Sequence, residues 1–230
     1  MLRKALLGGL AAAFITALGP LSADGQATGD QQSPVIIAAP IAAQIQPLDI
    51  RYPAGLADFL VYNDGHTIKV EPAHPSYTTV YGDKTYTLNE FHFHHPAEHV
   101  VAGALKPAPQ MEVHFVNKNA DGTAVVLGVF LDPMGLNATF KTIMDAAPPN
   151  GSKIKVPVKI DPSALLPVNR RYWMYMGSLT TPNYDQVVRW VVFQAHVAVD
   201  QSSIDRFARL YPDNARGTQP INRRFILSGP

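Results

Sequence analysis

Short runs rich in Val, Ile, Tyr and Phe, separated by Gly, Pro and Asn, follow one another along most of the chain. Several runs alternate apolar and polar residues with a period of two, as expected where the side chains of a strand point to opposite faces of a sheet. Turn-forming residues recur between them, which favours antiparallel neighbours. The predicted strands cover residues 58–63, 66–72, 78–82, 84–94, 110–118, 123–131, 152–160, 171–179 and 186–193.

Two segments, 136–147 and 201–211, have the three-to-four-residue apolar spacing of amphipathic helices. Asn137 is the expected N-cap of the first, and Ser202 or Ser203 that of the second. No internal repeat or low-complexity tract breaks this order. We therefore predict a mainly β fold, with a large central, mostly antiparallel twisted sheet and a few short peripheral helices.

The N-terminal residues 1–23 read as a secretory signal peptide, because a short basic start precedes a moderately long apolar run and then small residues. Cleavage after Ala23 and after Ala27 both fit, and a membrane anchor is the alternative interpretation. We expect residues 24–30 to be a flexible lead-in and 31–230 a single catalytic domain. The predicted location is periplasmic or secreted, without a membrane after signal cleavage.

Composition narrows the classes of partner. The chain has 230 residues, of which 47% are hydrophobic and 16% charged, enough for one sizeable core. Its net charge is +1 and the basic residues form no block, which argues against nucleic acid and favours a small neutral or weakly charged partner. There is no cysteine, so any metal must be held by His, Asp or Glu.

The segment FHFHHPAEHV, residues 91–100, contains four of the eight histidines of the chain. Because side chains alternate along a strand, Glu90, His92 and His94 should share one face while the phenylalanines between them occupy the other. A His-x-His pair on a strand presents two imidazoles to one point. Histidines on the polar face of a solvated sheet are the alternative.

The next predicted strand, 110–118, places Glu112 and His114 on one face by the same parity. If the two strands are antiparallel neighbours, His114 can join the His-x-His pair. Three neutral nitrogens and one open position are the usual ligand set of a catalytic zinc. Glu90 and Glu112 stand where they would accept the second N–H of a ligating histidine.

The sequence EFHFHHPAEH followed by MEVHFV resembles the zinc-binding core of the α-class carbonic anhydrases. Further segments resemble that family in the same order, so that the resemblance covers nearly all of residues 31–225. These segments are QSPVII from residue 32, NDGHTIKV (63–70), AVVLGVFL (124–131), DPSALLP (161–167), YWMYMGSLTTPNYDQVVRW (172–190) and DNARGTQPINRR (213–224).

The resemblance implies a zinc enzyme that reversibly hydrates carbon dioxide to bicarbonate and a proton, through attack by a zinc-bound hydroxide. It implies that one zinc ion is bound by His92, His94 and His114, with Thr180 and Glu98 orienting the hydroxide. The residues expected around these are Glu112, which orients His114, together with Glu90, His99 and Asn214.

The resemblance also assigns the substrate side. His66 matches the proton shuttle, a task that suits histidine as a residue type because a free imidazole titrates near neutral pH. Thr181 lies where the family contacts bicarbonate or inhibitor. The apolar wall for carbon dioxide is expected from Val116, Val126, Leu179 and Trp190. We expect carbon dioxide and bicarbonate as small-molecule partners, no nucleic acid, and a monomer or homodimer.

Other interpretations of these residues stay open at this point. His92, His94 and Glu98 also satisfy the first metal motif of the cupins, but no histidine for the second motif occurs between His114 and His196. A secreted zinc-binding module without activity is a further alternative. Individually, the two threonines could be an ordinary turn, His66 an exposed turn residue, Glu98 a surface acid and the wall residues simple core.

Three departures from the family pattern stand out. Glu90 occupies a position where the family commonly has Gln. Met176 and Asn183 replace prolines around the Thr-Thr segment. The aromatic N-terminal segment that usually precedes QSP is replaced by the short polar lead-in, which suggests a more open mouth to the site.

Overall fold

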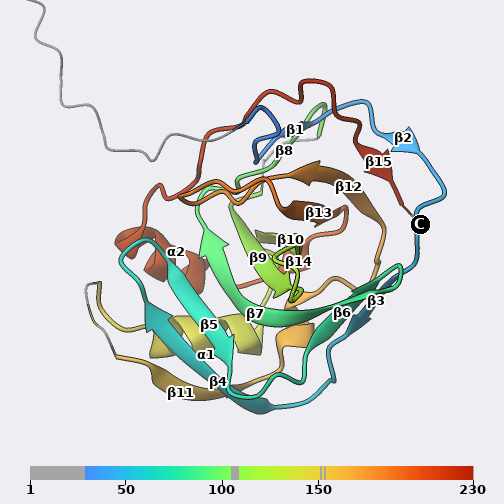
Figure 1. Cartoon of the computed structure of the whole chain (residues 1–230). Coiled ribbons are helices and arrows are strands. Elements are labelled where there is room, and N and C mark those ends of the chain that lie inside the picture. Colours follow the sequence, from blue (N-terminus) through green and yellow to red (C-terminus); the bar gives the residue numbers. More distant parts are fainter. Residues whose placement is uncertain (1–28, 105–108, 151, 153, 230) are drawn as a thin grey trace, which may run out of the picture.

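The computed structural model describes residues 29–104, 109–150, 152 and 154–229, so the predicted signal peptide lies outside the described residues. A large twisted sheet dominates the structure (Figure 1). Its strands follow one another in the order β11 (Val156–Ile160), β4 (Ala57–Asn63), β5 (Ile68–Pro72), β7 (Lys84–His94), β9 (Met111–Lys118), β10 (Ala124–Asp132), β13 (Val188–Phe193), β12 (Tyr172–Gly177), β15 (Leu227–Ser228) and β2 (Ile41–Ala42).

Shorter strands extend this sheet. The strand β6 (Thr78–Tyr81) pairs with β7 and carries β3 (Leu48–Arg51), while β14 (Val197–Ala198) pairs with β10. A separate pair is formed by β1 (Ile36–Ile37) and β8 (Val100–Val101). Most pairings are antiparallel, but β1–β8, β10–β13, β10–β14 and β15–β2 are parallel. The predicted fold class is confirmed, with these parallel pairs as its exceptions.

Two α-helices occur in the described part of the chain, where the sequence predicts them. In α1 (Ala138–Ala146) the Asn137 side chain accepts a hydrogen bond from the Phe140 amide, so this predicted cap is confirmed. In α2 (Gln201–Leu210) the cap is Asp200, which accepts from the Ser203 amide. The prediction of Ser202 or Ser203 is therefore wrong, because an acceptor just ahead of them satisfies the free N–H groups of the first turn.

A short 3-10 helix, η1 (Pro162–Leu165), follows β11. No helix in the described ranges combines the length and the apolar character that a membrane crossing requires.

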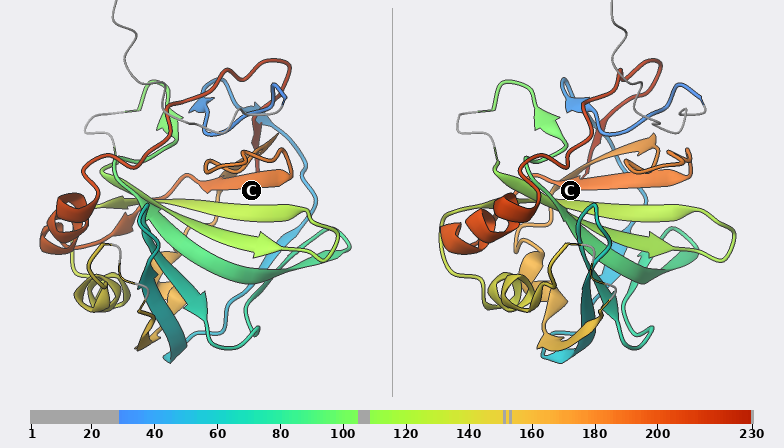
Figure 2. Two further views of the ribbon diagram at one scale, coloured as in Figure 1. Left: turned by 60° about the vertical axis from the view of Figure 1, so that its left-hand side comes forward. Right: turned by 90° about the vertical axis from the view of Figure 1, so that its left-hand side faces the viewer.

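The two faces of the sheet are covered differently. Helices α1 and α2 lie side by side against one face (Figure 2), and their apolar residues join the main core with Phe91, Phe93 and Val113. A smaller apolar cluster around Trp190 occupies the other face, beneath the N-terminal segment and the segment that follows α2. The histidines predicted as ligands lie on this second face.

A β-bulge in β7 decides which residues reach the second face. The register against β9 shifts between Leu88 and Glu90, which leaves Asn89 as an extra residue. As a result Leu88 and Phe91 both belong to the main core, although strict alternation would place them on opposite faces. The extra residue thus turns Glu90 and His92 toward the second face.

Candidate metal centre

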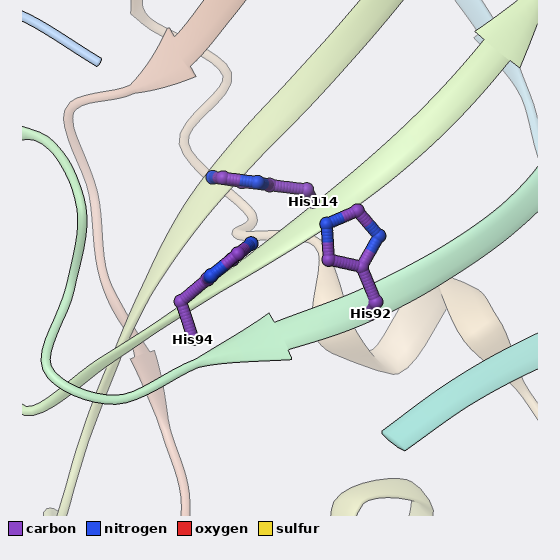
Figure 3. A group of neighbouring side chains, drawn as sticks. All are labelled: His92, His94 and His114. Carbon is purple, nitrogen blue, oxygen red and sulfur yellow. The ribbon is translucent and has the colours of Figure 1, made fainter. Parts of the chain in front are cut away.

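Three imidazole rings converge at the centre of the second face. His92 and His94 extend from β7, and His114 extends from β9 directly opposite His92 in the antiparallel register. One ring nitrogen from each lies within 4.8 Å of the others. Figure 3 shows the three rings turned toward a shared space between the strands. The predicted convergence of these side chains is confirmed, and such a group can hold one metal ion.

Oxygen acceptors orient the two rings of β7. Both carboxylate oxygens of Glu90 approach His92 Nδ1, at 3.1 and 3.0 Å. The backbone carbonyl of Asn214 accepts from His94 Nδ1 at 3.2 Å. Each contact places the proton on Nδ1 and leaves the lone pair on Nε2, which faces the shared space.

The third ring is held by a carboxylate that is completely buried. Glu112 Oε1 accepts from His114 Nε2 at 3.0 Å and from His99 Nδ1 at 2.8 Å. Its Oε2 accepts from the backbone amides of Glu98 at 3.0 Å and His99 at 2.8 Å. Burial opposes ionisation, but the neighbouring imidazoles and these N–H donors outweigh it, and the pKa of Glu112 lies well below its usual value. The His114 lone pair is therefore left on Nδ1.

Burial also keeps two of the rings neutral. It lowers the pKa of His114 to about 4, against the opposite effect of Glu112. Burial and the neighbouring rings move the pKa of His94 well below its usual value. The His94 Nε2 atom is buried without any hydrogen-bond partner. A neutral, unpartnered ring nitrogen in a polar cluster is costly unless it binds something, so the residues present fit a zinc ion.

Space for the buried carboxylate comes from a glycine on the next strand. Gly128 of β10 pairs with His114. A Cβ atom at this position would lie 2.7 Å from Glu112 Oε1, closer than a carbon and an oxygen can pack. The absence of a side chain at Gly128 thus allows Glu112 to sit behind His114.

Glu98, one of the two residues predicted to orient the hydroxide, lies beside the rings. Glu98 Oε1 accepts from the Arg216 amide at 2.8 Å and lies 3.4 Å from His94 Nδ1. Burial raises the pKa of Glu98 to about 8, although the Arg216 amide and the Thr180 side chain both favour its charged form. Thr180 is buried, while the neighbouring Thr181 is exposed and its carbonyl accepts from the Tyr184 amide.

A hydrogen-bonded chain behind the metal centre is absent from the sequence predictions. His99 Nε2 contacts the Tyr175 hydroxyl at 2.7 Å, and that hydroxyl donates to Ser33 Oγ at 3.0 Å. This chain continues the bonds from Glu112 to His99 and fixes both histidine side chains. No local pattern signals it, because Ser33 and Tyr175 are 142 positions apart in the sequence.

The residues predicted as an apolar wall lie together. Val116, Val126 and Trp190 occupy one row across β9, β10 and β13, and all three are buried in the smaller apolar cluster, with Leu179 packed against it. The rings of Trp190 and His114 are 4.7 Å apart. The structure thus brings this wall into contact with a candidate ligand.

His66 lies in an exposed turn between β4 and β5. Asp64 Oδ1 accepts from the amides of His66 and Thr67, both at 2.9 Å, and Gly65 has a φ of +92°. Asn214 Nδ2 donates to the His66 carbonyl at 3.0 Å, and the Asn214 carbonyl accepts from His94. One residue therefore links the turn of His66 to a candidate ligand.

The remaining histidines of the His-rich segment and the C-terminal half do not join the rings. His95 follows His94 but its Nδ1 contacts the Pro212 carbonyl at 2.9 Å. His196 pairs with Asp132.

Comparisons with known proteins agree on one family. A profile described as eukaryotic-type carbonic anhydrase matches residues 22–229. A carbonic anhydrase of Neisseria gonorrhoeae is 33% identical over 201 residues, which cover 87% of this chain and 78% of the relative. One from Pectobacterium carotovorum is 34% identical over 204 residues, covering 87% and 80%.

Solved structures give the same result. The α-carbonic anhydrase of Thermovibrio ammonificans, solved with the inhibitor sulfanilamide, matches with a TM-score of 0.78 and 35% identity over 86% of this chain and 87% of that one. The Photobacterium profundum α-carbonic anhydrase matches with a TM-score of 0.79 and 31% identity, covering 87% and 90%. The sheet is open, with β11 and β2 at its two edges, whereas cupins are β-barrels. Together with these matches, this shows that the cupin alternative is wrong.

Proposed function

The chain belongs to the eukaryotic-type, or α, carbonic anhydrase family, which hydrates carbon dioxide, and on this premise we propose that His92, His94 and His114 hold one catalytic zinc ion. The observation that carries the proposal is the convergence of three ring nitrogens, with His94 Nε2 buried and unpartnered. A zinc ion bound there would supply a Lewis acid that brings the pKa of a water molecule from about 15.7 to about 7.

The chain's own groups orient the reacting oxygen. Positive charge held between the three rings favours the carboxylate form of Glu98 over the acid form that burial favours. A Thr180 hydroxyl that donates to this carboxylate retains only lone pairs toward the site, so it accepts a hydrogen bond from the attacking oxygen. That arrangement directs the remaining lone pair of the oxygen at the substrate.

The row of Val116, Val126 and Trp190, with Leu179 at its edge, supports a role in holding carbon dioxide. This substrate is small, uncharged and apolar, so its transfer from water to such a surface costs little free energy. Thr181 is exposed and directly follows the buried Thr180 in the chain. We propose that it contacts bicarbonate as the product leaves.

His66 is proposed to carry the released proton to buffer. Its exposure allows exchange with solvent, and the hydrogen bonds of Asp64 and Asn214 fix the turn that bears it. An imidazole side chain is suited to accept and release a proton around neutral pH.

Stopped-flow measurement of carbon dioxide hydration tests the proposal. The zinc-loaded wild type should accelerate hydration, whereas His114→Ala should lose both zinc and activity. In His66→Ala we expect a kcat at least about tenfold lower, restored by imidazole buffer, with kcat/KM unchanged. Wild type that binds zinc but hydrates carbon dioxide no faster than buffer alone would support a binding module without activity.

We also propose a periplasmic or secreted location and a monomer or homodimer. The basic start and apolar run of residues 1–23 support the first. Mass spectrometry of the protein from the periplasmic fraction, together with size-exclusion chromatography with light scattering, tests both.

A further inference from the structure

A cavity lies away from the imidazole cluster, where β12, β13 and β15 meet the segment that leads into β15. Its volume is about 360 Å³, in the range of small-ligand pockets. The residues that line it are Gln31, Tyr81, Met174, Tyr175, Met176, Arg189, Arg223, Arg224, Phe225 and Leu227. The cavity thus combines three guanidinium groups with apolar and aromatic side chains.

Two of these guanidinium groups form no salt bridge among the described residues, although Asp30 interacts with Arg224 electrostatically from a longer distance. Arg224 donates to three backbone carbonyls, and Arg189 lies 4.3 Å from the ring centre of Tyr81 with a long contact to Met174 Sδ. Within the described ranges, neither lies within salt-bridge distance of an acidic group, whereas Arg223 pairs with Asp30. The cavity therefore has an excess of positive charge.

The apolar half of the cavity is partly open to solvent. Met176 is 42% exposed and Phe225 is 70% exposed. Water hydrates the guanidinium groups but not the large apolar side chains beside them. A purely apolar ligand would cover the apolar side chains but leave the guanidinium groups without an anionic partner. A ligand with both an anionic group and an apolar body would cover both parts.

We propose that this cavity binds a small organic carboxylate with an aromatic or aliphatic body. The fork of Arg189 suits a planar carboxylate, and because the guanidinium already rests on Tyr81, little further ordering is needed to bind it. The body of the ligand lies against Met176 and Phe225. None of the three candidate zinc ligands lines this cavity, although Tyr175, whose hydroxyl contacts His99 behind the metal centre, does.

Methyl NMR on the full-length zinc-loaded protein tests the proposal. With methionine methyls labelled, 3-phenylpropionate should shift the signals of Met174 and Met176 saturably, and leave that of Met144 in α1 unchanged. The neutral 3-phenylpropionamide should bind about tenfold more weakly, because it lacks the charge-assisted hydrogen bonds.

Arg189→Gln should weaken 3-phenylpropionate binding by about tenfold. The matched control is Arg170→Gln, which removes an arginine that also lies over an aromatic ring, that of Phe193, but outside the cavity; its binding should equal that of the wild type. If Arg189→Gln fails to fold, Met176→Glu must weaken binding instead, through repulsion. The proposal is overturned if neither methyl shifts, if the amide binds as tightly as the carboxylate, or if both arginine variants lose affinity equally.

Discussion

The two faces of β7 and β9 are equally buried but are stabilised by different interactions. On one face Phe91 and Phe115 stack with ring centres 4.9 Å apart, and Phe93 packs against rings from both helices. On the other face, one residue away along the same strands, His92 and His114 are 8% and 1% exposed. Burial of the phenylalanines stabilises the fold directly, whereas burial of the imidazoles requires a hydrogen-bond partner for each N–H.

This difference teaches that stability and function are separated across the thickness of one sheet. The apolar face contributes free energy of folding. The polar face costs free energy, and it recovers that cost only partly through Glu90, Glu112 and the Asn214 carbonyl. The unpartnered His94 Nε2 marks the part that a bound ion would recover.

The largest expected effect is on activity, from His94→Ala. Removing one of the three proposed zinc ligands should lower kcat/KM by about ten-thousandfold, equivalent to ~5 kcal/mol of transition-state stabilisation. Without metal, the free energy of unfolding of the variant should lie within about 1 kcal/mol of that of the wild type, because the ring that is removed had an unpartnered nitrogen. Calorimetry beside stopped-flow kinetics checks both. A large loss of metal-free stability would contradict the separation of the two faces.

On the opposite face, Phe93→Ala should have the reverse effect. Deleting this fully buried ring leaves a cavity beneath both helices and should lower the free energy of unfolding by about 4 kcal/mol. At a temperature where the variant is folded, it should still bind one zinc ion per chain. Denaturant unfolding with metal analysis gives the answer, and loss of zinc from the folded variant would show that the faces are coupled.

An intermediate effect is expected from Glu112→Gln. A side-chain amide cannot accept the four N–H groups that this carboxylate accepts, so the ring of His114 would lose its fixed orientation. Zinc affinity should fall by about 10- to 100-fold. Competition with a chromogenic chelator measures it, with the exposed Asp145→Asn in α1 as the matched control. Unchanged affinity in Glu112→Gln would contradict an orienting role.

The smallest effect is expected from Glu90→Gln. An anionic acceptor makes the His92 ring more electron-rich than a neutral one does, and so weakens the pull of the metal on its water ligand. The Gln variant should therefore reach half-maximal kcat/KM at a pH lower by about half a unit. Superimposable pH–rate curves for the two proteins would refute this.

The sequence predicts the parts of this architecture that repeat along the chain. Alternation and turn signals locate nine of the ten described strands that are longer than two residues, and they miss β3. The same parity identifies the faces of His92 and His114. Two-residue strands such as β1 and β8 are too short to carry a periodic pattern. The sequence also gives no signal for the bulge at Asn89, although without it Leu88 and the histidines would share a face.

The parts that the sequence leaves out are contacts between distant positions. Tyr175 and Ser33 meet only because β12 and the N-terminal segment pack on the same side of the sheet. The role of Gly128, which leaves space for the Glu112 carboxylate, can be recognised only when β10 is known to lie beside β9. The Asp200 cap, in contrast, was open to prediction, since Asp and Ser are comparable N-caps and Asp200 comes first.

X-ray absorption at the zinc edge tests the central claim most directly. The zinc-loaded protein should show one ion per chain with three imidazole nitrogens at about 2.0 Å and one further oxygen donor from solvent. In His114→Ala this three-nitrogen shell should be lost. A fourth protein ligand in the wild type, or a zinc shell without three imidazoles, would contradict the claim that these strands build an open three-histidine centre.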